Sequence, residues 1–109
     1  AGRVADLKEM VSEWKKTREK TKLPIVMYYM PAGGALGSPP HQGEFRALRQ
    51  LSLEAGLPFY DVMKLFESHP TPRKLYQHPK DGHIGDLGHA VLADAFAKMI
   101  IERGYLKKR

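Results

Sequence analysis

The sequence predicts an α/β protein, more specifically the C-terminal part of a doubly wound three-layer fold. Residues 23–30 form a continuous apolar run rich in β-formers, which is typical of a strand buried on both faces of a parallel sheet. A second short strand pattern follows at residues 57–62, after an amphipathic helical segment. The order helix, strand, helix, strand, long loop, helix contains one βαβ unit and predicts two parallel strands with three main helices.

Composition sets limits on the class of protein. The chain has 109 residues, 42% of them hydrophobic, which suits one domain with a core. The absence of cysteine excludes disulfides, zinc–thiolate sites and thiol nucleophiles, but it does not fix the compartment. The net charge of +6 arises mainly from a first helix of mixed charge and from a basic tail, without a basic–aromatic motif, so we expect no nucleic acid partner. No apolar run is long enough to predict a membrane span.

The first helix is predicted from about residue 4 to residue 20. Its apolar residues recur at the spacing of one helical face: Leu7, Met10, Val11 and Trp14. Thr21, Lys22 and Pro24 are expected to end it. Because the chain starts with Ala1 rather than Met and is predicted to be helical almost at once, we expect it to be a piece of something longer.

Residues 31–43 are dense in glycine and proline and are expected to be irregular. They follow the carboxyl end of a strand, where α/β proteins bind ligands, so Gly33 and Gly34 are candidate substrate-lining residues. A second helix is predicted over residues 44–55, with Phe45, Leu48 and Leu51 inward and Gly56 as its stop.

After the second strand, Asp61 is expected to cap a turn or short helix that runs to Phe66. Residues 68–80 contain three prolines and are expected to form a long ordered loop. The last helix is predicted to start at Asp86 as its N-cap and to end near Gly104. Its apolar stripe consists of Val91, Leu92, Ala95, Phe96, Met99 and Ile100.

The turn before this last helix carries the candidate chemistry. Asp81 lies two residues before His83 on a glycine-containing turn, from which its carboxylate can reach the imidazole. An aspartate in that position fixes the histidine tautomer and stabilises the imidazolium, which is what a histidine general base requires. Asp81 and His83 are therefore the candidate catalytic residues.

The segment D-G-H-I-G-D-L-G-H-A-V-L-A, residues 81–93, resembles the last sequence block of the SGNH (GDSL-type) serine esterases and acyltransferases. Asp81 and His83 fall on the acid and base positions of that family, and Gly88 with His89 on its helix-opening Gly-His. Residues 57–61 also resemble the family's final strand. The resemblance covers nearly the whole chain but only the rear half of the family's domain. It implies an ester hydrolase or O-acyltransferase acting on an acyl-ester substrate, without a cofactor.

The nucleophile and oxyanion residues of that family have no counterpart in this sequence. The four serines are Ser12, Ser38, Ser52 and Ser68, none in a G-D-S or G-x-S-x-G setting, and the chain has no asparagine. An acid and a base without a nucleophile cannot transfer an acyl group, so this chain alone is expected to be inactive. We expect the N-terminal half of the same protein, or a symmetry-related chain, to complete the sheet.

One alternative stays open at the same turn. His78, Asp81 and His83 could ligate a metal, which would make the chain a non-enzymatic α/β binding module with a metal or partner site at residues 78–89. His89 is expected to be structural, beneath the loop. His41 and His69 are expected to be exposed loop residues, and the strand residues Tyr28, Tyr29 and Met30 to lie in the core.

Overall fold

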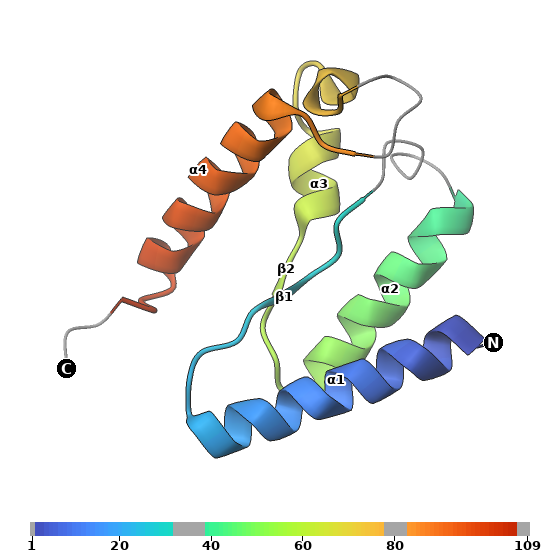
Figure 1. Cartoon of the computed structure of the whole chain (residues 1–109), viewed down its shortest axis with the longest axis vertical. Helices are drawn as coiled ribbons and strands as arrows, with labels where there is room; N and C mark the ends of the chain where they lie inside the picture. The colour runs from blue at the N-terminus through green and yellow to red at the C-terminus, as the bar shows by residue number, and fades with distance from the viewer. Residues whose placement is uncertain (1, 32–38, 78–82, 107–109) are drawn as a thin grey trace.

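The computed structural model describes residues 2–31, 39–77 and 83–106. These residues form four α-helices and two short parallel strands, so the predicted mixed α/β class with a parallel strand pair is confirmed. The helices lie on both sides of the strands (Figure 1): α1 (Gly2–Thr21) and α2 (Pro39–Glu54) on one side, α4 (Asp86–Glu102) on the other. None of the helices in these described segments is both long and apolar enough to cross a membrane.

The sheet consists of β1 (Met27–Tyr28) and β2 (Phe59–Tyr60), paired in parallel with Met27 opposite Phe59 and Tyr28 opposite Tyr60. The first strand is much shorter than the predicted residues 23–30, because only two residues of β2 pair with it and Pro24 has no N–H to donate. The prediction that the first strand is buried on both faces is wrong for this chain by itself, because Tyr28 is 42% exposed and Met30 is 37% exposed.

The helix ends show why the elements stop where they do. Gly56, with a φ of 74°, follows α2: its N–H donates to the Leu53 carbonyl, and the Leu57 N–H donates to the Ser52 carbonyl. This is a Schellman motif, and it confirms Gly56 as the stop. Gly104, with a φ of 72°, ends α4 with the same pair of bonds.

The start of α2 differs from the prediction that residues 31–43 are irregular. The helix begins at Pro39, and His41 therefore lies within a helix rather than in a loop. Two prolines at the start of a helix are favourable, because their fixed φ suits the first turn and the N–H they lack has no helical acceptor there. Pro39 and Pro40 therefore begin a helix, whereas the prediction places them in an irregular segment.

Three clusters of buried residues form the core of the described segments, and the smallest of them is the pair Phe45 and Met63. One joins α1, α2 and the strands and contains Val11, Met27, Leu48 and Leu57. Of the predicted α1 stripe, Val11 is buried, whereas Met10 and Trp14 are exposed. Another cluster lies at the end of the molecule where the chain enters α4. Its members come from α3 (Val62–Glu67), the 3₁₀ helix η2 (Pro72–Leu75), the residue directly after η2, and α4. They are Val62, Phe66, Leu75, Tyr76 and Leu92.

Candidate functional site

The backbone from His83 to Gly85 is fixed by a small antiparallel bridge between Tyr76 and Ile84. The Gln77 N–H donates to the His83 carbonyl at 3.0 Å, and the Gly85 N–H donates to the Leu75 carbonyl at 2.8 Å. The His83 side chain itself is exposed. The bridge therefore holds the histidine backbone in place while the imidazole stays accessible to a substrate or partner.

Tyr76 connects this bridge to the segment at the carboxyl end of β1 through a hydrogen bond. Its buried hydroxyl donates to the carbonyl oxygen of the buried Pro31 at 2.7 Å, and its ring makes an edge contact with Phe66 of α3. Burial raises the pKa of Tyr76 from 10.0 to about 12, so the hydroxyl keeps its proton and remains a donor even in moderately alkaline solution. His83 consequently lies on a segment anchored at the carboxyl end of the parallel strands, where α/β proteins bind ligands.

The sequence prediction did not identify Tyr76 as a site residue. Residues 68–80 were expected to be a loop, but they contain η2 and the bridge to Ile84. The available signal was the apolar pair Leu75–Tyr76 between prolines, because a leucine and a tyrosine in a polar loop indicate a buried anchor. Both side chains are indeed buried.

Gly88 fixes the position of α4 against η2. A Cβ atom at this position would overlap with the Leu75 carbonyl oxygen, and it would also crowd the Ile84 side chain. The first turn of α4 can therefore approach the η2 backbone only because residue 88 is glycine. The close approach sets the distance between the helix and the bridge that carries His83.

The start of α4 differs from the prediction in two respects. The N-cap residue is Gly85 rather than Asp86, because Gly85 is extended and completes the bridge before the helix begins. Asp86 lies instead in the first turn, where a carboxylate interacts favourably with the helix dipole. His89 was expected to lie beneath the loop, but its side chain is exposed.

Other predicted residues are placed more simply. Asp61 is the N-cap of α3, as predicted: its Oδ1 accepts from the Lys64 N–H at 2.8 Å. His69 is half-buried in the turn after α3, and its Nδ1 accepts from the Thr71 N–H at 3.0 Å. The Ser52 hydroxyl is buried and donates to the Leu48 carbonyl at 2.7 Å, so it is committed to α2, while Ser12 and Ser68 are exposed.

Several candidate residues lie outside the described segments: Asp81, Gly33, Gly34, His78 and Ser38. The predicted Asp81–His83 pair and the alternative metal set are therefore represented only by His83. Within the described part of the chain, no group of three His, Asp or Glu side chains could hold a metal ion.

The chain was also compared with known proteins. No protein-family model matches it, and neither the curated proteins nor the solved structures give a significant match.

Proposed function

We propose that this chain supplies the acid and base of an SGNH-type ester hydrolase or O-acyltransferase, with a serine nucleophile that lies outside residues 1–109. The observation that carries the proposal is the position of His83. Its side chain is exposed, it lies three residues before the start of α4, and its backbone belongs to a bridge that Tyr76 joins to the carboxyl end of β1. In an open parallel sheet, this edge is where substrates bind.

In the proposed reaction, His83 takes the proton from the serine hydroxyl as the serine attacks the acyl carbon. It then returns the proton to the leaving alcohol when the ester bond breaks. Asp81 hydrogen-bonds to the imidazole, keeps it in the correct tautomer and stabilises the imidazolium. Gly33 and Gly34, after β1, are proposed to line the acyl or alcohol subsite. The oxyanion donors, like the serine, come from outside this chain.

The first test is intact mass spectrometry of the purified protein before and after treatment with a fluorophosphonate probe, which labels activated serines. We expect a second, co-purifying polypeptide to take the label. A label on one of the four serines of this chain would refute the assignment of the nucleophile.

The second test compares two variants of the complete enzyme with a chromogenic acetyl ester. His83→Ala is expected to lower kcat by about six orders of magnitude, as loss of a triad histidine does. Asp86→Ala, three residues away and in the first turn of α4, is the matched control and is expected to affect stability alone. Equal, large losses of activity in both variants would contradict the role of His83.

A further inference from the structure

One edge of β1 is unpaired among the described residues. In a parallel ladder, alternate residues of a strand bond to the same neighbour. The Met27 N–H donates to the Pro58 carbonyl of the chain next to β2 at 2.8 Å. The backbone N–H and C=O of Tyr28, the next residue, are therefore directed to the opposite edge, where the described sheet has no third strand.

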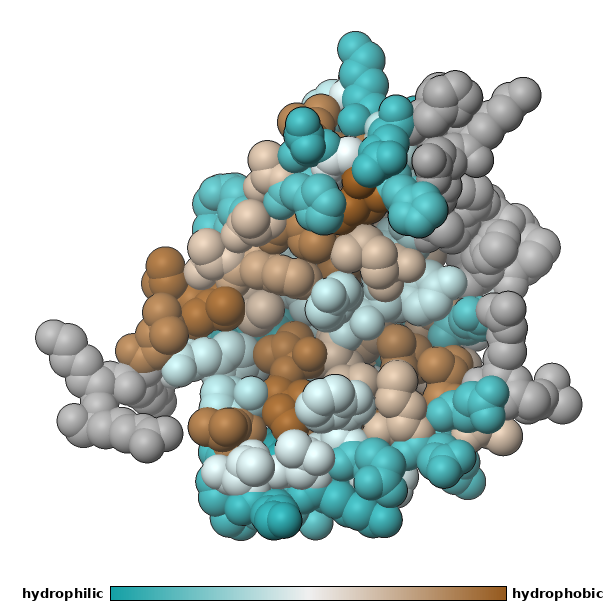
Figure 2. Space-filling model, viewed as in Figure 1, coloured by the Kyte–Doolittle hydropathy of each residue, from teal (hydrophilic) through white to brown (hydrophobic). Residues whose placement is uncertain are grey.

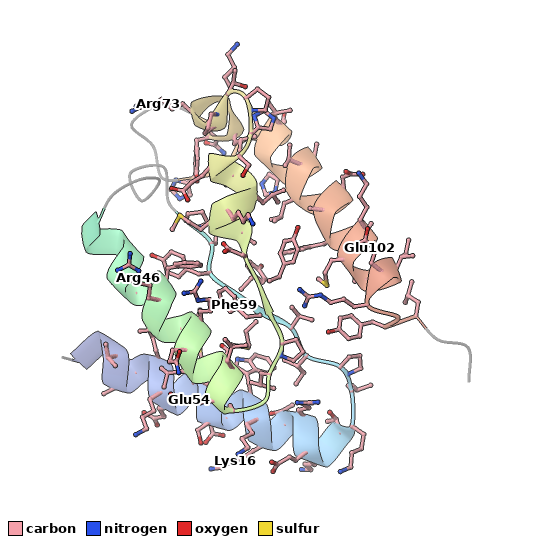
Figure 3. All side chains as sticks on the ribbon, turned by 180° about the vertical axis from the view of Figure 1, so that it is seen from behind. Lys16, Arg46, Glu54, Phe59, Arg73 and Glu102 are labelled. Carbon is pink, nitrogen blue, oxygen red and sulfur yellow. The ribbon has the colours of Figure 1, made fainter. Side chains whose placement is uncertain are left out.

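The two edges of this sheet are not equivalent. At the β2 edge, the Arg103 guanidinium donates to the Phe59 carbonyl at 3.4 Å and lies 5.8 Å from the centre of the Tyr60 ring. Figure 3 shows Phe59 between α2 and α4. A charged side chain over a strand is a common device against further pairing. Residues 23–30, around β1, contain no charged residue at all.

An apolar groove of about 360 Å³ runs along the β1 side, between the strand and α4. Figure 2 shows hydrophobic side chains exposed between the two helical layers in this view. The lining is apolar or aromatic throughout: Pro24, Val26, Tyr28, Phe96, Met99, Ile100, Tyr105 and Leu106. An exposed strand edge beside such a surface offers both backbone hydrogen bonds and apolar area to a new strand.

The shape of the molecule agrees with a sheet that is too narrow. The extents are 41 × 40 × 17 Å, and the radius of gyration is 15.0 Å, against about 13 Å for a compact domain of 100 residues. The two strands overlap when the molecule is viewed along its shortest axis (Figure 1), so the sheet is narrow in the direction in which strands would be added. Two strands alone make a marginal sheet.

We infer that the free edge of β1 receives a further parallel β-strand, uncharged and apolar on both faces, from the polypeptide that completes the sheet. The helices on both sides of β1 would cover both faces of an added strand, which is the environment of parallel strands. A second copy of this chain fits less well. Two-fold pairing at this edge would be antiparallel and would bring together two chains of net charge +6.

The identity of the donor polypeptide rests on the proposed function, but the choice of edge does not. The test is hydrogen–deuterium exchange on the protein as purified, with resolution at single amides. We expect the amides of Tyr28 and Met30 to exchange at least about tenfold more slowly in a complex with a second, non-identical polypeptide than after its removal. The Met27 amide, already bonded to Pro58, serves as the internal control.

Each other outcome overturns a stated part. Fast exchange at Tyr28 in the complex, or protection in a species of twice the chain mass, would overturn the inference. The inference would also be overturned if the purified protein were a single chain of 12.3 kDa in which the amides of Tyr28 and Met30 exchange fast. Protection by a partner that no fluorophosphonate labels would keep the edge inference and refute the proposed function. A partner that takes the fluorophosphonate label but leaves the Tyr28 amide unprotected would support the proposed function and refute the edge inference.

A pair of variants separates backbone pairing from side-chain contact. Tyr28→Pro removes the edge-facing N–H but leaves the Met27 bond to Pro58, and we expect it to weaken the partner complex at least about tenfold. Tyr28→Ala keeps that N–H and is expected to have a smaller effect. Circular dichroism checks that both variants fold. A folded Tyr28→Pro variant that retains full affinity would show that the partner docks elsewhere.

Discussion

Apolar side chains towards the two ends of α4 are covered to different degrees, with the exposed Leu87 at the amino end and the buried Met99 near the carboxyl end as exceptions. At its amino end, Gly88 lies against the Leu75 backbone, and Leu92 is buried with Phe66 and Tyr76. Towards its carboxyl end and just beyond, Ile101 is 68% exposed and Leu106 is 74% exposed. The chain therefore supplies its own packing around the bridge that carries His83, but leaves apolar surface uncovered near β1. Substitutions at the two ends should accordingly differ in their effect on the isolated chain.

The largest effect is expected for Gly88→Ala. The new Cβ would overlap with the Leu75 carbonyl, a backbone atom that cannot move without displacing η2. We expect the free energy of unfolding, measured in urea, to fall by at least about 3 kcal/mol. Gly43→Ala is the matched control, because a Cβ on this exposed residue of α2 meets nothing within 4 Å. It should stabilise by about 0.5–1 kcal/mol. If both variants lost similar amounts of unfolding free energy, the close approach of Gly88 to Leu75 would not be the cause.

Tyr76→Phe should come next. It removes one hydroxyl and leaves the buried Pro31 carbonyl without that donor, so we expect a loss of about 1–3 kcal/mol in urea unfolding. Tyr28→Phe, at an exposed tyrosine, should change stability by less than about 0.5 kcal/mol. An unchanged Tyr76→Phe variant would mean that ring packing alone holds the bridge.

The same tyrosine predicts a pH dependence. Burial raises its folded-state pKa from the ordinary value of 10.0 to about 12, so the folded protein holds this proton more strongly than the unfolded chain. The resulting stabilisation is complete below pH 10 and is lost as the pH rises from 10 through 12. Thermal unfolding across this range should show a smaller decline in Tyr76→Phe than in the original chain. If the melting temperatures of the two proteins fell equally over this pH range, ionisation of Tyr76 would not be the cause of the decline.

Asp61→Ala should have an intermediate effect. It deletes the side chain that caps the Lys64 N–H at the start of α3, which should cost about 1 kcal/mol in chemical unfolding. Asp61→Asn retains an oxygen acceptor and should recover most of the loss. If Asn were as harmful as Ala, the cap hydrogen bond would not be the cause.

Ile101→Ser should have the smallest effect on the isolated chain, within about 0.5 kcal/mol, because the side chain is already in water. Leu92→Ser, at a buried position of the same helix, is the contrasting variant and should be strongly destabilising. Comparable losses from both, in the same unfolding assay, would show that the ends of α4 do not differ as described.

The sequence predicted the elements whose signals are local. Helical periodicity and a glycine stop located α2 and α4, and Asp61 was recognisable as a cap. What it could not predict depends on contacts between distant segments. The short extent of β1 depends on how many β2 residues pair with it, and the shift of the α4 cap to Gly85 depends on a bond to Leu75. The bond from the Tyr76 hydroxyl to Pro31, 45 positions earlier, depends on a distant contact in the same way, although the Leu75–Tyr76 pair itself indicates a buried position.

That separation of 45 positions also bears on the order of folding. The bridge between Tyr76 and Ile84 closes a short local loop, so it can form together with α4 before the strands meet. The bond from Tyr76 to Pro31 closes a much longer loop, through α2, β2 and α3, and requires both strands to be in place. The histidine segment should therefore acquire its local shape early and its attachment to the sheet among the last steps of folding.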